Sequence, residues 1–283
     1  MTVSVTKLKN LARPKLLMHN RFSKYKATEN LKQSFWLVFD LTQREFSQRY
    51  KGTFLGVLWP IVYSLLFLAI FSFIFTVVLS VRWGSAPGNG ALMIFCGLVP
   101  HLFISEVMSR SPTVIHGATN LVKKVRFPVR LIPVVSVNAA FILCIINLIL
   151  LIFFGIIKQQ ITIYSLVILP AIMLPLYLFA VGLGWFLSAL GVFFRDISQI
   201  APVAVQLMMF LAPVFYPLQN IPEKVRPIFL LNPLTYFIEA LRNGLDGHIS
   251  WSTWAAVTLF YACFALTGAF VFRRLRPAFG DLL

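Results

Sequence analysis

Charged residues are scarce in this sequence, and acidic residues are the scarcest. Of 283 residues only 12% are charged, with 9 Asp+Glu against 25 Lys+Arg, whereas 59% are hydrophobic and 15% aromatic. A soluble fold cannot bury that much apolar surface, so the composition indicates a protein whose solvent is the lipid bilayer. High hydrophobicity also excludes a disordered chain. With only 3 cysteines, a disulfide scaffold is excluded as well.

Motifs for catalysis are missing too. The sequence contains no G-x-x-x-x-G-K-[ST] phosphate loop, no G-x-S-x-G nucleophile elbow and no His, Cys, Asp and Glu cluster at metal-ligand spacing. Paired acidic residues inside apolar runs, which a proton-coupled transporter or a metal-dependent membrane transferase needs, are also absent. The sequence therefore predicts a non-enzymatic membrane protein with no cofactor of its own.

Long apolar runs dominate what is present. Because a helix needs about 20 apolar residues to cross the hydrocarbon core, the region 52–272 predicts six transmembrane helices. The expected spans are 57–81, 91–110, 131–157, 161–194, 197–218 and 249–272. A shorter apolar run between spans five and six predicts re-entrant or gate helices. The expected fold is an all-α integral membrane protein.

Basic residues concentrate on one side of these spans. They occur in the N-terminal tail 1–30, in the loop between spans two and three, and in the C-terminal tail 273–283. By the positive-inside rule, this pattern predicts that both termini are cytoplasmic. The same anchoring accounts for the net charge of +16 without a nucleic-acid partner.

Residues 31–51 precede the first span and carry apolar side chains at spacings of three and four. Polar residues fill the other face, so the pattern predicts an amphipathic helix. Its flanking cations favour a helix that lies on membrane lipids at the cytoplasmic interface. The alternative is a helix packed on a partner protein.

Several short motifs, taken in order, resemble those of membrane subunits of type-2 ABC exporters for polysaccharides. They are RYKGTFLGVLWP (49–60), NLVKKVRFP (120–128), LIP (131–133), GVFFRDISQI (191–200), PVFYP (213–217) and LLNPLT (230–235). The resemblance spans about residues 30–280 and is nearest to O-antigen lipopolysaccharide exporters, with wall teichoic acid and capsule exporters as relatives. It implies a permease subunit that moves a lipid-linked polysaccharide across the bacterial inner membrane.

The resemblance also implies partners. Such permeases act as homodimers and bind two copies of a separate ATPase, which carries ATP and Mg. A type-2 permease for drugs or lipids is an alternative of the same fold. An ion-coupled secondary transporter and a membrane-embedded glycosyltransferase are alternatives of other classes, but both need paired or clustered intramembrane acids, which the sequence lacks.

The resemblance places a short coupling helix in the basic loop at about 116–127. Apolar side chains between the cations suit docking into a cleft on the ATPase, whereas the alternative is a loop whose cations only set the topology. The expected coupling residues are Leu121, Val122, Lys123, Lys124, Val125, Arg126 and Phe127.

Aromatic side chains recur at four-residue intervals along the first span. They are Trp59, Tyr63, Phe67, Phe71 and Phe75. Each step advances about 40° beyond a full turn, so the row spirals around the helix. Aromatic faces stack on sugar rings, which makes the row a candidate channel lining; the alternative is a lipid-facing or dimer-packing row.

Two further sites are expected. Glu106 is an acid inside a span and stands four residues before Arg110, a spacing that predicts an ion pair. Glu106 is then either a gating charge or one partner of a structural pair. The short apolar run after span five predicts an outer gate at Pro233, Tyr236, Glu239 and Arg242, with the last two residues paired; the alternative is a simple external cap.

Overall fold

The computed structural model describes residues 31–81, 83, 90–119 and 128–283. Within these ranges every regular element is a helix, which confirms the predicted all-α class. The longer helices are α2 (Leu31–Tyr50), α3 (Trp59–Ser72) with its π-helical continuation η2 (Phe73–Val78), α4 (Gly90–Arg110), α7 (Leu131–Ile157), α8 (Ser165–Phe193), α9 (Ile197–Phe210), α11 (Pro233–Leu245) and α12 (Trp251–Leu275). The shorter ones are η1 (Gly56–Leu58), η3 (Ser111–Thr113), α5 (Val114–Gly117), η4 (Leu218–Asn220), α10 (Arg226–Leu230), η5 (Arg276–Ala278) and α13 (Phe279–Leu282).

Five of the described helical segments are long and apolar enough to cross a bilayer. They are Trp59–Val78, Gly90–Gly117, Leu131–Ile157, Ser165–Phe193 and Trp251–Leu282. The fifth expected span, 197–218, differs: its helix α9 has 14 residues and ends at Phe210. At 1.5 Å per residue that helix is about 21 Å long, which is shorter than the hydrocarbon core.

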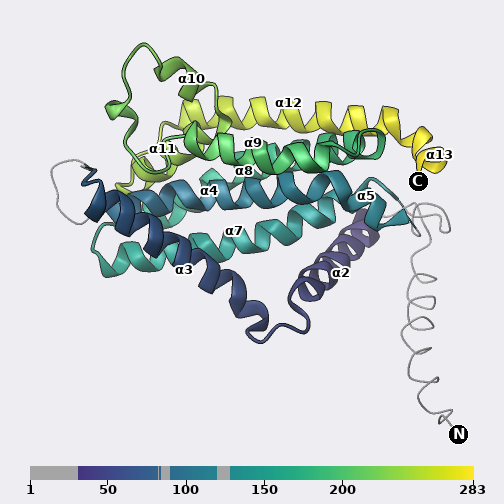
Figure 1. The fold of residues 1–283 in the computed structure, drawn as a ribbon, viewed down its shortest axis with the longest axis horizontal. Coiled ribbons are helices and arrows are strands. Elements are labelled where there is room, and N and C mark those ends of the chain that lie inside the picture. Colours follow the sequence, from purple (N-terminus) through teal and green to yellow (C-terminus); the bar gives the residue numbers. More distant parts are fainter. Residues whose placement is uncertain (1–30, 82, 84–89, 120–127) are drawn as a thin grey trace, which may run out of the picture.

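The long helices run side by side as a bundle with two distinct ends (Figure 1). One end carries α2, α5 and α13, whereas α10 and α11 lie at the opposite end. The predicted short helices between spans five and six are thus present as α10 and α11. The expected coupling residues Leu121 to Phe127 lie outside the described ranges.

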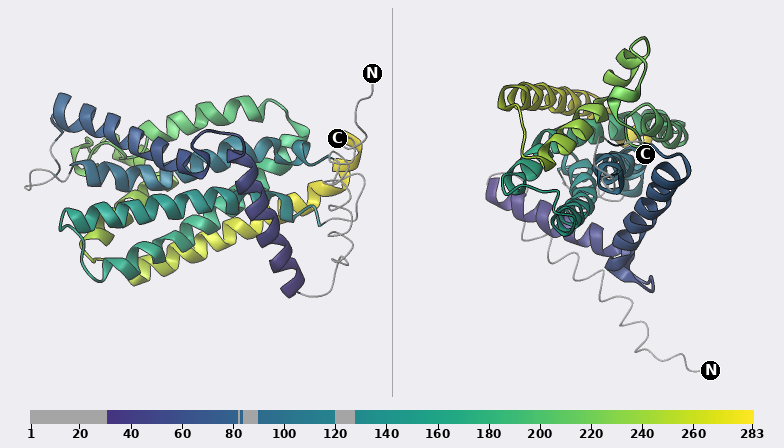
Figure 2. Two further views of the ribbon diagram at one scale, coloured as in Figure 1. Left: turned by 90° about the horizontal axis from the view of Figure 1, so that it is seen from below. Right: turned by 90° about the vertical axis from the view of Figure 1, so that its left-hand side faces the viewer.

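Helix α4 is the inner helix of the bundle, and α3 is an outer one (Figure 2). Of the apolar window of α4 and α5, 72% is buried, compared with 6% for α3 and η2. Large side chains of α4, such as Phe95, Leu98 and Phe103, are fully enclosed by α7, α8, α9 and α11. The exposed surface of α3 is therefore available to lipid or to another protein chain.

Helices α8 and α12 form the most extensive helix pair, because glycines let their backbones approach closely. A Cβ added at Gly268 would meet the carbonyl group of Gly182, and one added at Gly182 would lie 2.9 Å from the Cα of Ala265. Backbone atoms cannot move aside as side chains do, so these positions require glycine.

We expect Gly268→Leu to force α12 away from α8 and to lower the free energy of unfolding by about 1–3 kcal/mol. Thermal unfolding of the purified protein in detergent measures the effect. Gly280→Leu is the matched control, because nothing lies within 4 Å of a Cβ at Gly280. Equal stability of the two variants would contradict this account of the helix pair.

Candidate functional site

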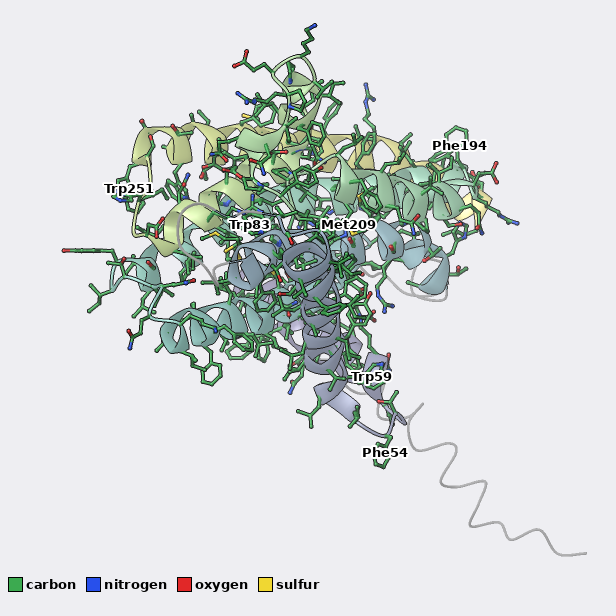
Figure 3. All side chains as sticks on the ribbon, turned by 60° about the vertical axis from the view of Figure 1, so that its left-hand side comes forward. Phe54, Trp59, Trp83, Phe194, Met209 and Trp251 are labelled. Carbon is green, nitrogen blue, oxygen red and sulfur yellow. The ribbon has the colours of Figure 1, made fainter. Side chains whose placement is uncertain are left out.

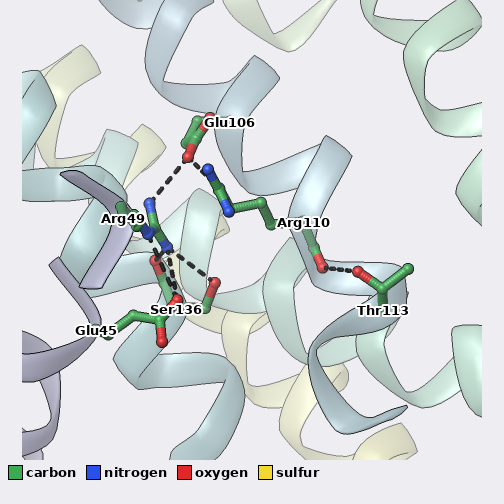
Figure 4. A network of polar contacts seen from close by, with 6 residues as sticks. All are labelled: Glu45, Arg49, Glu106, Arg110, Thr113 and Ser136. Carbon is green, nitrogen blue, oxygen red and sulfur yellow. Dashed lines mark hydrogen bonds and ion pairs between the residues drawn. The ribbon is translucent and has the colours of Figure 1, made fainter. Parts of the chain in front are cut away.

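A buried arginine joins three helices at the end of the bundle that carries α2. The Arg49 side chain, on α2, is only 4% exposed, and its Nη1 lies 2.9 Å from Oε1 of Glu106 on α4 (Figure 4). Its Nη2 lies 3.4 Å from Glu45 and donates to the carbonyl oxygen of Ser136 on α7 at 3.4 Å. Arg49 therefore fixes α2 to the helices that it crosses.

Glu106 is shared by two arginines. The structure contains the expected ion pair, with Arg110 Nε donating to the same Oε1 that Arg49 contacts. The pKa of the Arg49 guanidinium lies below its usual value. Burial and the nearby Arg110 lower it more than Glu106 and Glu45 raise it. Glu106 thus contacts two cations, so its loss leaves the buried Arg49 guanidinium beside Arg110 with only the longer contact to Glu45.

The sequence indicated Glu106 and Arg110 as a pair but not Arg49 as the third member. Arg49 stands 57 residues from Glu106, so no local spacing connects them. In the sequence, Arg49 stands out only as the first residue of the motif RYKGTFLGVLWP. The available signal is an arginine at the end of the helix that precedes the first span, but Arg44 on the same helix gives a similar signal.

Helix α2 divides its apolar residues between two faces. Leu37 is buried in a cluster with Ile115, Ile132 and Phe272. The aromatic side chains of Phe35, Trp36 and Phe39 are instead 54–68% exposed. Helix α2 packs on the bundle itself, mainly on α7, and leaves an aromatic face free for the membrane interface.

Four rings of the aromatic row, from Tyr63 to Phe75, contact one another in tilted pairs along α3 and η2. Ring centroids lie 4.6 Å apart for Tyr63 and Phe67, 5.4 Å for Phe67 and Phe71, and 6.5 Å for Phe71 and Phe75. Trp59 and Tyr63 are each 50% exposed, at the end of α3 where Figure 3 labels Trp59.

The far end of this row packs on the loop that follows α9. Phe215 is fully buried and lies with its ring centroid 4.4 Å from Phe71 and 4.6 Å from Phe75. The row is therefore exposed at its Trp59 end, whereas its Phe75 end packs against the buried Phe215. It connects the end of the bundle near Glu106 with the segment that breaks the fifth span.

That break leaves backbone carbonyl groups without helical partners, and side chains satisfy them. Asn232 Nδ2 donates to Met208 at 2.9 Å, and the Tyr216 hydroxyl donates to Phe210 at 2.7 Å. Arg242 Nη2 donates to Pro213 at 2.6 Å and to Val214 at 3.1 Å. Irregular backbone inside a membrane requires this kind of protein environment.

Arg242 is the central residue of the expected gate. It is 7% exposed, pairs with Glu239 at 2.8 Å, donates to Met93 on α4, and lies 4.6 Å from the centroid of the Trp83 ring. Pro233 occupies the first turn of α11, where the Asn232 side chain caps the helix by accepting from Leu234. Tyr236 is half-buried on the same helix.

These contacts place the four expected gate residues on one short helix that is hydrogen-bonded to the broken fifth span. A Cβ at Gly97 of α4 would lie 2.8 Å from the backbone of Val214, so the loop after α9 rests directly on the inner helix.

Within the described residues, no group of three or more His, Cys, Asp or Glu side chains is placed to hold a metal ion.

Known proteins with similar sequences are transporter components. The model of the family described as ABC-2 type transporter matches residues 37–245. An O-antigen export system permease protein, RfbA of Myxococcus xanthus, is 32% identical over 200 residues, which are 70% of this chain and 75% of the relative.

Other relatives cover nearly the whole chain. An O-antigen export system permease protein RfbA of Klebsiella pneumoniae is 27% identical over 259 residues, which are 90% of this chain and 97% of the relative. The polysialic acid transport protein KpsM of Escherichia coli is 24% identical over 238 residues, which are 81% of this chain and 87% of the relative.

Proposed function

This chain belongs to the ABC-2 type transporter family, and from that premise we propose that it is the permease subunit of an exporter for a lipid-linked polysaccharide, with O-antigen as the substrate class. The permease acts in the bacterial inner membrane as a homodimer. Two copies of a separate ATPase bind its cytoplasmic end and hold the ATP and Mg. The permease itself provides the path.

The observation that carries this proposal is the full-length correspondence with O-antigen permeases. Relatives named for O-antigen export align over 90% of this chain and 97% of their own length. A relative named for polysialic acid transport aligns over 81% of the chain at lower identity. All of these names specify glycan polymers, which favours a polysaccharide over a drug or a simple lipid as the cargo.

The arrangement of the two ends supports a cytoplasmic position for both termini. Helix α2 and the C-terminal helix α13 lie at the same end of the bundle (Figure 1). Exposed cations lie beside or within the ends of the long helices there, among them Arg130, Arg195 and Arg273. The positive-inside rule assigns such an end to the cytoplasm, where an ATPase is supplied with nucleotide.

The cargo assignment is tested by surface display. A host that synthesises O-antigen but lacks its own exporter would express this chain together with its cognate ATPase. Antibody staining of intact cells is expected to show O-antigen only when both subunits are present. Surface display of another polymer in place of O-antigen would overturn the substrate class, and display without the ATPase would overturn the mechanism.

The aromatic row supports a channel that binds sugars weakly and repeatedly. Neutral rings at and next to the exposed end of the row would give a glycan several weak contacts without a tight site, and conduction requires such weak multi-site binding. Replacing Tyr63, Phe67 and Phe71 together by alanine is expected to reduce export several-fold while the protein still inserts. The matched control replaces Leu66, Ile70 and Phe73, which are 53–59% exposed on the same helix. Normal export by the aromatic variant would contradict the lining role.

The coupling segment lies between α5 and α7. Leu121→Asp or Val125→Asp is expected to abolish ATP-driven export, because a carboxylate buried against an apolar cleft is costly to desolvate. Co-purification with the ATPase and ATP turnover in proteoliposomes measure the effect. Unchanged binding and unchanged export in both variants would remove these residues from the coupling site.

A further inference from the structure

A cleft of about 140 Å³ lies between α3, α4 and α7, beside the arginine network. Trp59, Tyr63 and Ser64 of α3 line one wall, Glu106 of α4 lies on another, and Asn147 of α7 on the third. Apolar residues, among them Leu102 and Leu143, complete it. None of the contacts described above requires this space to be open.

Asn147 carries a polar atom without a partner. Its side chain is 5% exposed, and its Oδ1 has no hydrogen-bond partner in the described structure. The other asparagine in the body of α7 is different, because Asn138 Oδ1 accepts from the Tyr177 hydroxyl at 2.6 Å. A buried acceptor that lacks a donor is unfavourable, so a ligand that donates a hydrogen bond would be stabilised at Asn147.

Glu106 supplies a second acceptor. Both arginines contact Oε1, so Oε2 keeps its capacity to accept, and the Glu106 side chain is 27% exposed. The two guanidinium groups already compensate its charge, which disfavours a cationic ligand. An anion is disfavoured by the carboxylate and the amide oxygen. The cleft therefore matches a neutral ligand that offers hydroxyl donors.

Aromatic rings and size narrow the ligand further. Trp59 and Tyr63 are half-exposed, so their faces remain available to stack on a ring. A cavity of about 150 Å³ holds a benzene molecule, so a cleft of about 140 Å³ accommodates a single six-membered ring. We propose that this cleft binds one pyranose ring, with its hydroxyl groups donating to Asn147 and Glu106 and its C–H face on Trp59 and Tyr63.

The source of the ring rests on the proposed function: in a polysaccharide exporter it is a sugar unit of the lipid-linked glycan. The affinity of the cleft for a pyranose does not depend on that assignment. The cleft begins at Tyr50, the last residue of α2, so an amphiphile in the adjacent leaflet can insert its sugar beside Glu106 while its chain stays in lipid.

Photo-crosslinking tests the site directly. The full-length chain in phospholipid nanodiscs is illuminated with an alkyl glucoside whose chain carries a diazirine next to the sugar. The control probe has the same chain with a phosphocholine head. We expect the glucoside to label peptides from 59–64 and 143–147 at least several-fold more than the control probe does.

Variants separate the site from general lipid contact. Asn147→Leu and Trp59→Leu are expected to reduce the excess labelling by the glucoside several-fold, and Trp59 is exposed enough that folding does not depend on it. Asn138→Leu, which removes the same amide from the same helix outside the cleft, is expected to leave labelling unchanged. Equal labelling by the two probes, or equal loss in Asn138→Leu, would overturn the site.

The two proposals fail separately. Loss of preferential labelling in a chain that still displays O-antigen with its ATPase would refute the pyranose site and leave the exporter assignment intact. Preferential labelling in a chain that displays no glycan would support the site and refute the assignment.

Discussion

A Glu106→Gln variant is expected to lose about 3 kcal/mol of stability, because it breaks the shortest ion pair of a buried guanidinium and leaves that charge poorly compensated. Arg49, with 4% of its side chain exposed, would then stand beside Arg110 without the carboxylate that both contact. We place the cost at the lower end of the usual range because Glu106 is 27% exposed and because Glu45 still contacts Arg49 at 3.4 Å. The junction of α2 with α4 and α7 would loosen, and the effect is measured by unfolding in detergent.

The matched control is Arg110→Gln, which removes the exposed partner. Arg110 is 46% exposed, so its loss is expected to cost less than about 1 kcal/mol. The double variant Arg49→Met with Glu106→Leu replaces both buried charges by apolar groups and is expected to recover most of the lost stability. Equal losses in Glu106→Gln and Arg110→Gln would show that Arg49 does not depend on the carboxylate.

Arg242→Met is expected to have a comparably large effect at the other end of the molecule. The variant leaves the carbonyl oxygens of Pro213, Val214 and Met93 without the donor that now satisfies them. Hydrogen bonds to charged groups contribute about 1.5–3 kcal/mol each, so the loop after α9 should detach from α4. We expect export to fall to background and the free energy of unfolding to drop by about 3 kcal/mol.

Arg226→Met is the control for Arg242→Met. Arg226, on α10, donates to one carbonyl oxygen, that of Ile221, at 3.2 Å. Its replacement is expected to leave export within twofold of the parent protein, since single hydrogen bonds contribute little net stability. A similar loss of export in both variants would mean that the outer segment responds to charge in general rather than to the Arg242 contacts.

The sequence predicts the long helices well because their signal is local. The third expected span, 131–157, coincides with α7 because the run between Arg130 and Lys158 contains only uncharged residues, nearly all apolar. Pro170 and Pro175 lie inside α8 without ending it, since packing in the bundle outweighs their local cost. The length of an apolar run depends only on consecutive residues, so it can be read from the sequence.

The end of α9 could not be predicted in this way. The apolar run continues to residue 218, yet the helix stops at Phe210, and distant side chains satisfy the freed carbonyls. Asn232 and Arg242 lie 24 and 28 residues away from the carbonyls of Met208 and Val214. Arg49 escaped prediction for the same reason, as its partner Glu106 is remote in sequence.

We propose that the permease provides the path and that a separate ATPase supplies the energy. The purified chain, alone and then together with its ATPase, would be reconstituted in proteoliposomes that contain lipid-linked O-antigen. The account predicts no ATP hydrolysis by the chain alone, and vanadate-sensitive hydrolysis with movement of the glycan across the bilayer when both subunits are present. ATP hydrolysis by the chain alone, or glycan movement without the ATPase, would contradict it.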